Sequence, residues 1–258
     1  MIVAEAELRA DAIGDRLATL KQAASARSPA PSLHDALRRT SVALLTEVKR
    51  RSPSKGAIAK DLDAVVQANA YAEGGASGLS ILTEPKHFGG SVADLRSVVR
   101  AVALPVLKKD FHVQRSQLLE ARAEGASAAL LIVRAVTPER LQELMTYGRD
   151  LALELLVEVR DEAELELALS LGATMIGVNN RNLETLIIDP TTAERLIPRI
   201  PADVIAIAES GIATLADVER YAAVGADAVL IGSSLSAAAD PVAATRALAA
   251  VPRVHRAG

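Results

Sequence analysis

Short apolar runs, many of them rich in β-branched residues, recur along the chain, and each ends in polar or charged residues. Uninterrupted apolar runs of this length are typical of parallel strands buried on both faces. Amphipathic segments rich in Ala, Leu, Glu and Arg lie between the runs, and several have Thr or Asp near the start and Gly near the end, as helices do. The eight predicted strands cover residues 42–49, 79–84, 105–110, 129–133, 154–159, 174–179, 204–210 and 228–234.

The alternation of strand and helix predicts an α/β protein with a (β/α)8 TIM barrel. An open doubly wound sheet is the alternative, but no G-x-G-x-x-G motif follows the first strand. Residues 1–40 stand outside the repeat and predict an N-terminal helical extension with a Ser/Pro-rich linker. We expect the barrel over residues 41–258, in a single domain overall. The extension either closes the bottom or side of the barrel or covers its active-site end.

The composition excludes several classes of function. The chain has 258 residues, of which 50% are hydrophobic and 2% aromatic, and it has no Cys. Without Cys there is no disulfide framework, thiolate nucleophile or cysteine-ligated metal. A net charge of -3 and few aromatic residues argue against binding to nucleic acid or to a membrane surface. The four His residues do not have metal-ligand spacing, so we predict no metal site.

The apolar stretches are too short to span a membrane, and the N-terminus lacks a basic segment followed by an apolar core. We therefore expect neither a signal peptide nor a transmembrane helix, and we expect a cytoplasmic protein.

The carboxyl ends of the predicted strands carry most of their charged and polar side chains. In a (β/α)8 barrel these ends meet at one mouth, where the active site lies. Because charged residues are rarely buried without partners, their concentration at one end predicts a catalytic cluster. The candidate residues are Glu47, Lys49, Lys109, Asp110, Glu158, Asn179, Arg181, Glu209, Ser210, Gly232 and Ser233.

Glu47 and Lys49 lie two residues apart on one strand and therefore share a face. The chain has only seven Lys against 22 Arg, so Lys49 and Lys109 suggest chemistry that needs a titratable ammonium group. A Lys there serves as a general acid, and a Glu as an acid or base. The alternative is that both Lys residues are structural ion-pair partners of the neighbouring Glu residues.

Small residues after three strands predict a phosphate site. AESGI and IGSSL follow the last two strands, where barrels of this kind commonly hold phosphate through backbone N–H groups. RRSPSKG, after the first strand, adds Ser52 on a loop that Pro stiffens. SPSKG alone would be read as an ordinary loop, so the prediction depends on the joint occurrence.

The segments EVKRRSPSKG, LTEPKHFGGS, LKKDF, LLVEV, GVNNRNLET, AESGI and LIGSSL occur in the order and spacing of the indole-3-glycerol phosphate synthase family. From about Leu33 to the last strand, the chain resembles that family. The resemblance implies a carboxy-lyase of tryptophan biosynthesis that needs no cofactor and no metal. Its substrate would be the phosphorylated anilino-ribulose 1-(2-carboxyphenylamino)-1-deoxyribulose 5-phosphate, and its products indole-3-glycerol phosphate, carbon dioxide and water. We expect a monomer, with a weak homodimer as the alternative.

The resemblance also implies roles for individual residues. Lys109 would be the general acid that protonates the ribulose carbonyl oxygen, and Glu158 the acid/base of the dehydration. Lys49 would be the second catalytic Lys, with Glu47 as its neighbour. The other assignments are Asn179, Glu209 and Ser210 to orientation of the sugar hydroxyls and catalytic groups, Arg181 to contact with Asn179 or the substrate carboxylate, and Ser52, Gly211, Gly232 and Ser233 to the phosphate cradle.

The chain departs from the family pattern at two places. Arg160 follows VEV, where the family usually has His, and it either points outward or lowers the pKa of Glu158. His112 and Gln114 are unusual in the loop after residues 105–110. We expect these departures to affect rate or substrate range more than the class of reaction.

The two Phe residues of the chain, Phe88 and Phe111, both lie just past predicted strand ends. We predict that they form an apolar wall for the aniline ring of the substrate. Local loop packing is the competing interpretation, above all for Phe88.

Other barrel functions fit the residues less well. Phosphoribosylanthranilate isomerase would be expected to use a Cys, and histidine-pathway barrels place paired Asp residues at strand ends. A glycosidase with Glu158 and Glu209 as its carboxylate pair would leave Lys49 and Lys109 without a purpose. A barrel that only binds a phosphorylated metabolite stays open on residue type alone.

Overall fold

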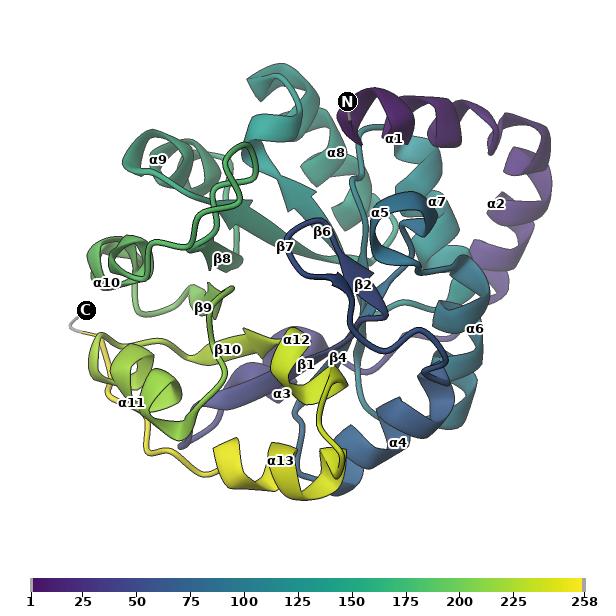
Figure 1. Ribbon diagram of the computed structural model, residues 1–258. Coiled ribbons are helices and arrows are strands. Elements are labelled where there is room, and N and C mark those ends of the chain that lie inside the picture. The colour runs from purple at the N-terminus through teal and green to yellow at the C-terminus, as the bar shows by residue number, and fades with distance from the viewer. Residues whose placement is uncertain (1, 257–258) are drawn as a thin grey trace.

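A closed ring of parallel strands forms the centre of the protein, and helices surround it (Figure 1). The computed structural model describes residues 2–256. Residue 1 of the predicted extension and residues 257–258 of the predicted barrel segment lie outside the described residues. The order around the ring is β1-β10-β9-β8-β7-β6-β5-β4, which confirms the predicted TIM barrel. The strands are β1 (Ala43–Val48), β4 (Gly78–Leu82), β5 (Val106–Lys109), β6 (Ala128–Ile132), β7 (Glu154–Val159), β8 (Met175–Asn179), β9 (Ile205–Glu209) and β10 (Ala228–Ile231).

An outer helix follows each barrel strand, and several of these helices begin at a capping side chain. Thr214 and Asp217 form a capping box, and Asp161 accepts a hydrogen bond from the backbone N–H of Glu164. The outer helices are α4 (Ala64–Glu73), α6 (Val92–Ala101), α7 (Arg115–Glu124), α8 (Pro138–Asp150), α9 (Glu162–Ser170), α10 (Thr191–Leu196), α11 (Leu215–Ala223) and α13 (Pro241–Leu248).

Short elements interrupt the loops at the carboxyl ends of the strands. The RRSPSKG segment, predicted as a loop, contains a small hairpin of β2 (Arg51–Ser52) and β3 (Gly56–Ala57). Two short helices, α5 (Pro85–Phe88) and α12 (Ser233–Ser236), follow β4 and β10. A 3₁₀-helix over Val133–Ala135 follows β6, and another over Ile197–Arg199 lies at the other end of the barrel, between α10 and β9.

The predicted N-terminal helical extension contains three α-helices. They are α1 (Ile2–Asp11), α2 (Leu17–Ala26) and α3 (Leu33–Leu37), and the 3₁₀-helix Gly14–Arg16 separates the first two. That residues 1–40 and the barrel form a single domain stays a prediction.

Different parts of the extension lie at opposite ends of the barrel. Leu33 and Leu37 of α3 are fully buried against the inner barrel residues, so α3 closes the barrel bottom. At the start of β7, the Glu154 carboxylate accepts hydrogen bonds from the Ser32 hydroxyl and from the backbone N–H groups of Leu33 and His34. In contrast, α1 lies near the carboxyl ends of the strands, beside α7 (Figure 1).

Alternate residues of each strand fill the inside of the barrel with aliphatic side chains, including Leu45, Leu107, Leu156 and Ile207. Two residues further along the same strands, the inward positions are occupied by Glu47, Lys109, Glu158 and Glu209. Because the side-chain period of a strand is two, these four residues share the interior with the apolar core and lie above it. The barrel therefore changes from apolar to ionic at its mouth.

Lys108 lies on the opposite face of β5 from Lys109. Its ammonium group is buried and lies 2.8 Å from the Glu120 carboxylate of α7. The second oxygen of Glu120 accepts a hydrogen bond of 2.6 Å from Arg16 in the N-terminal extension. Adjacent Lys residues thus have separate partners, one inside the barrel and one between the barrel and α7.

Candidate active site

Lys109 lies between two buried carboxylates at the mouth of the barrel. Its Nζ atom is 3.1 Å from Oε2 of Glu158 and 3.3 Å from Oε2 of Glu209. The side chain of Lys109 is 14% exposed, whereas those of Glu158 and Glu209 are 4% and 3% exposed. The ammonium group is therefore accessible from the mouth, while the carboxylates that hold it are withdrawn from solvent.

The two carboxyl groups have pKa values that are shifted in opposite directions. Burial raises the pKa of Glu209 to about 8, and the charge of Glu158 adds to this rise against the opposing effect of Lys109. Burial also acts to raise the pKa of Glu158, but the charge of Lys109 and a hydrogen bond from Asn179 hold it below its usual value. Glu158 is thus ionised and Glu209 protonated at neutral pH.

The same charges keep Lys109 protonated. Burial acts to lower the pKa of Lys109, but the charge of Glu158, joined by that of Glu209 once it ionises, holds it above its ordinary value. The site therefore presents an ammonium acid beside one carboxylate base and one neutral carboxylic acid. Carboxyl groups whose environments separate their pKa values are a general arrangement for acid–base catalysis.

Gly177 on β8 makes room for the Glu209 carboxylate. A Cβ atom at position 177 would lie 1.9 Å from Oε1 of Glu209, which is shorter than any real contact. Among the residues that the structure describes, this buried Oε1 atom has no hydrogen-bond partner. A glycine is therefore needed here for close approach, and the carboxyl oxygen that it accommodates is the one without a hydrogen-bond partner.

A second ion pair lies across the mouth, at the end of β1. The Lys49 ammonium group pairs with the Glu47 carboxylate, as their shared strand face predicts. Ser80 of β4 lies 3.5 Å from the other carboxylate oxygen of Glu47. A Cβ atom at Gly232 would lie 2.6 Å from Oε1 of Glu47, so here too a glycine leaves space for a carboxylate.

Asn179 at the end of β8 links the ionic cluster to the following loop. Its amide donates a hydrogen bond of 2.9 Å to Oε1 of Glu158, and its carbonyl oxygen accepts one of 2.9 Å from the backbone N–H of Arg181. The Arg181 guanidinium donates to the carbonyl oxygen of Leu186 in the same loop. The contact of Arg181 with Asn179 is thus made by its backbone.

Ser210 and Gly211 form a strained turn after β9. Ser210 has a φ of 68° and Gly211 a φ of 81°, both in the left-handed region. A non-glycine residue there costs on the order of 1–3 kcal/mol and often marks a functional site. The buried amide of Asn180 stabilises this turn, because it donates a hydrogen bond of 3.1 Å to the Ser210 carbonyl oxygen.

The structure brings three of the four predicted phosphate residues onto adjacent loops. Gly211 follows β9, and Gly232 precedes Ser233 at the start of α12, after the neighbouring strand β10. The Ser234 hydroxyl and the Ile212 carbonyl oxygen, 3.4 Å apart, join these two loops. Ser52 is buried in the hairpin after β1, where its hydroxyl accepts a hydrogen bond from the backbone N–H of Lys55.

The two Phe residues follow β4 and β5. Phe111 is half-buried and packs on the inner barrel core beside Leu183 and Ala135, which places apolar side chains at the mouth. Phe88 is also half-buried and ends α5. These positions agree with the predicted wall, and its contact with an aniline ring stays a prediction.

The two departures from the family pattern lie away from the reacting cluster. The charge of Arg160 acts on Asp189, and the charge that lowers the pKa of Glu158 is that of Lys109. His112 is buried, and one of its ring nitrogens lies 2.7 Å from the Leu130 carbonyl oxygen. Burial lowers the pKa of His112 to about 4, so it is neutral at neutral pH.

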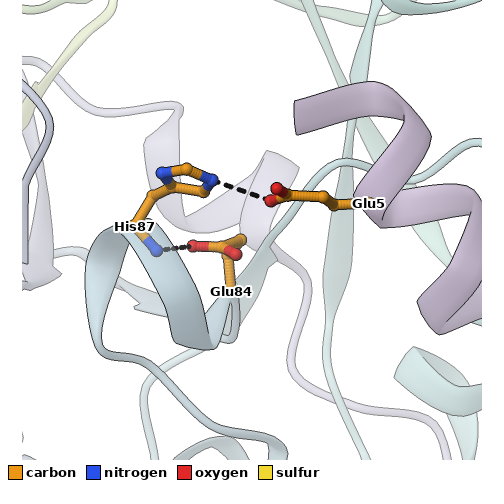
Figure 2. Close-up of side chains that lie close together, drawn as sticks. All are labelled: Glu5, Glu84 and His87. Atoms are coloured by element: carbon orange, nitrogen blue, oxygen red, sulfur yellow. Dashed lines mark hydrogen bonds and ion pairs between the residues drawn. The ribbon is translucent and has the colours of Figure 1, made fainter. Parts of the chain in front are cut away.

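Glu5, Glu84 and His87 bring possible metal-ligand atoms together beside the mouth (Figure 2). These atoms are already engaged within the protein. The Glu84 carboxylate caps α5 by accepting hydrogen bonds from three backbone N–H groups, and the Glu5 carboxylate contacts Lys86 and His87. We therefore describe the cluster as a contact between α1 and α5.

Sequence reasoning missed several residues that shape the site. Ser80 and Gly177 occupy inward positions of β4 and β8, and counting in steps of two along each strand would have found both. Asn180 is adjacent to Asn179 but supports a different loop, and no local pattern separates the two.

The fold is that of a TIM barrel, and the cluster at its mouth brings Lys and Glu side chains together in an arrangement suited to acid–base chemistry. A family model described as Indole-3-glycerol phosphate synthase matches residues 2–248. The chain belongs to this family, whose members are carboxy-lyases of tryptophan biosynthesis.

Curated relatives agree along most of the chain. It is 46% identical over 242 residues to "Indole-3-glycerol phosphate synthase" of Nocardioides sp., which covers 94% of this chain and 92% of that protein. It is 48% identical over 231 residues to "Indole-3-glycerol phosphate synthase 1" of Streptomyces coelicolor, which covers 90% of this chain and 86% of that protein.

Solved structures of low sequence identity share the fold. A 3-hexulose-6-phosphate synthase from Salmonella typhimurium superposes with a TM-score of 0.64 at 17% identity, over 80% of this chain and 96% of that chain. A thiamine phosphate pyrophosphorylase from Pyrococcus furiosus gives 0.61 at 16% identity, over 84% and 96%. Within residues 2–256, no helix has the length and apolar character needed to cross a membrane.

Proposed function

We propose that this chain closes the indole ring of 1-(2-carboxyphenylamino)-1-deoxyribulose 5-phosphate, releasing carbon dioxide and water and leaving indole-3-glycerol phosphate. The observation that carries the assignment is Lys109, an ammonium group accessible from the mouth and held by two buried carboxylates. Ring closure onto a carbonyl carbon needs an acid beside the carbonyl oxygen, and a fixed ammonium group is such an acid.

In the first half of the reaction, Lys109 gives its proton to the ribulose carbonyl oxygen. The ring carbon that bears the carboxylate attacks the carbonyl carbon, and a carbon–carbon bond forms. The bond to the carboxylate then breaks, carbon dioxide leaves, and its electron pair restores the aromatic ring. The charge of Glu158 holds Lys109 in its protonated form for this step.

In the second half, the new hydroxyl group leaves as water and a neighbouring proton is removed. The elimination needs one proton donor and one proton acceptor within reach of the same substrate. Glu158, ionised at neutral pH, takes the role of acceptor, and the protonated Glu209 supplies the proton that leaves with the hydroxyl group, since Lys109 has already given its own. Lys49 serves as the second catalytic Lys, with Glu47 as its partner.

The remaining predicted residues bind and orient the substrate in this proposal. Backbone N–H groups near Gly211, Gly232 and Ser233 hold the phosphate dianion, with Ser52 closing the cradle from the β1 side. Asn179 and Ser210 orient the sugar hydroxyls. The aryl ring of the substrate and its carboxylate contact three further side chains, those of Phe88, Phe111 and Arg181.

Crystals soaked with sulfate test the phosphate cradle separately from turnover. Density for the ion on the N–H groups near Gly211 and Ser233 supports the cradle. A site without an ion, with these N–H groups bonded elsewhere, contradicts it.

The proposed enzyme works as a monomer in the cytoplasm. The Lys109–Glu158–Glu209 cluster is assembled within one chain, so no partner subunit is needed to complete it.

Turnover of the anilino-ribulose phosphate, followed by the appearance of indole fluorescence, tests the proposal. The unmodified protein should show this activity, and Lys109→Ala should abolish it while circular dichroism shows a folded barrel. Lys60→Ala, at an exposed position, is the matched control and should keep full activity. A protein that binds the substrate without forming the indole product contradicts the proposal, as does hydrolysis of aryl glycosides that survives Lys109→Ala.

A further inference from the structure

Arg9 of α1 binds two buried carboxylates at the carboxyl ends of β4 and β5. Its guanidinium lies 2.7 Å from Oδ1 of Asp110 and 3.4 Å from Oε1 of Glu84. The Glu84 side chain is fully buried and that of Asp110 is 7% exposed. Buried carboxylates need a counter-charge or hydrogen-bond donors, and Arg9 supplies both to this pair.

Each of these carboxylates holds a segment that carries one of the two Phe residues of the chain. Glu84 accepts hydrogen bonds from three backbone N–H groups of α5, of which that of Phe88 is 3.1 Å away. Asp110 accepts one of 2.8 Å from the backbone N–H of Phe111 and one of 2.6 Å from the Thr83 hydroxyl. One arginine of the extension thus connects the anchors of both segments.

Asp110 also follows Lys109 directly in the chain. Its carboxylate fixes the backbone at the point where β5 ends and the loop to α7 begins. A displacement of Asp110 therefore moves the main chain that carries the reacting ammonium group.

The helix α1 is held beside the mouth mainly by polar contacts. Its buried side chains in the described residues are the small Ala6 and Ala10, and Leu8 is 70% exposed. Glu5 adds contacts with Lys86 and His87 of α5 (Figure 2). In contrast, α2 packs on α7 through an apolar cluster that includes Leu20 and Leu119, so the attachment of the extension does not depend on α1 alone.

We propose that Arg9 is a positioning residue for the reaction. It holds the Glu84 and Asp110 carboxylates together and thereby fixes the Phe88 and Phe111 segments that enclose the aryl ring of the substrate. This inference rests on the proposed function for its substrate, but the geometry of the clamp does not depend on it. The N-terminal extension then contributes to binding without touching the substrate.

Arg9→Met tests the clamp, because Met keeps an unbranched side chain and removes the charge. Arg16→Met is the matched control, since Arg16 lies in the same extension and binds the nearly buried Glu120 carboxylate at 2.6 Å. We expect Arg9→Met to raise KM at least tenfold with a smaller fall in kcat. Arg16→Met should lower the melting temperature by a similar amount and leave KM within twofold.

Two further measurements separate positioning from a general loss of stability. Hydrogen exchange of residues 84–89 and 110–113 should accelerate in Arg9→Met and stay unchanged in Arg16→Met, whether or not the substrate is turned over. In a protein carrying Asp110→Asn, Arg9→Met should change KM by less than the same substitution does in the unmodified protein. Arg9→Lys, which reaches one carboxylate, should fall between the unmodified protein and Arg9→Met, and it serves if the Met variant does not fold.

Equal changes of KM and exchange in the Arg9 and Arg16 variants would overturn the proposal, as would a KM that follows the melting temperature alone. An unmodified protein without turnover would contradict the proposed function instead. In that case the exchange comparison still decides whether Arg9 orders the two segments.

Discussion

Replacement of Glu209 with Gln should stabilise the protein increasingly as pH rises, while it removes activity. The substitution keeps the size of the side chain and mimics the protonated acid that burial favours. The pKa of Glu209 is about 8 in the folded protein, against an ordinary value of 4.5 in the unfolded chain. Between these two pH values the folded protein binds more protons than the unfolded chain, so stability falls as pH rises.

The expected magnitude follows from the difference between the two pKa values. Each pH unit in this window lowers the free energy of unfolding of the unmodified protein by about 1.4 kcal/mol relative to Glu209→Gln. From pH 4.5 to pH 7 the difference grows by about 3 kcal/mol, and it levels off above pH 8. Glu209 is almost completely buried, so solvent screening reduces this effect little.

Urea unfolding at pH 5, 6, 7 and 8, followed by circular dichroism because the chain has no Trp, measures the difference. Glu219→Gln, at an exposed position, changes the net charge equally and should show a flat difference across this range. A difference between Glu209→Gln and the unmodified protein that stays constant or shrinks with rising pH would refute the reasoning. It would mean that Lys109 keeps Glu209 ionised despite its burial.

Three further substitutions test other parts of the site. Gly177→Ala should lower kcat at least tenfold in the fluorescence assay, because the new Cβ atom would lie 1.9 Å from a Glu209 oxygen; unchanged kcat would contradict this steric argument. Phe111→Ala should raise KM at least tenfold but lower stability by only about 1–2 kcal/mol, because Phe111 is half-buried. A large loss of stability with little change in KM would instead identify Phe111 as a residue of the core. His112→Gln should remove a loss of about 3 kcal/mol that the unmodified protein suffers as pH falls from 6.5 to 4, since burial keeps His112 neutral when folded. Equal slopes in urea unfolding would count against it.

The barrel was predictable because each strand carries a continuous apolar signal and each helix a separate amphipathic one. The ionic cluster followed from the same pattern, since Lys109, Glu158 and Glu209 are charges at the ends of apolar runs. Their pairing was not predictable, because it depends on the order of strands around the ring and on the exact reach of each side chain. The pairing also joins the two interpretations of Lys109, which is both an ion-pair partner and the proposed acid.

The path of the extension could not be predicted from local patterns. Its helices have polar faces whose partners lie far along the chain, such as Arg9 with Asp110, and no periodicity encodes a contact across 101 positions. The hairpin in RRSPSKG was missed for a different reason. Its strands have two residues each, which is too short for an alternating pattern to appear.

Because β5 carries two adjacent Lys residues, its ion pairs do not by themselves specify the register of the strand. A shift by one residue would turn Lys109 toward α7 and Lys108 into the barrel, so that each ammonium group would exchange its partners. Such a shift would preserve the charge at the mouth and yet misalign Asp110 with Arg9 and Thr83. The contacts of Asp110 therefore distinguish the native register in energy, where the ion pairs of the two Lys residues do so only weakly.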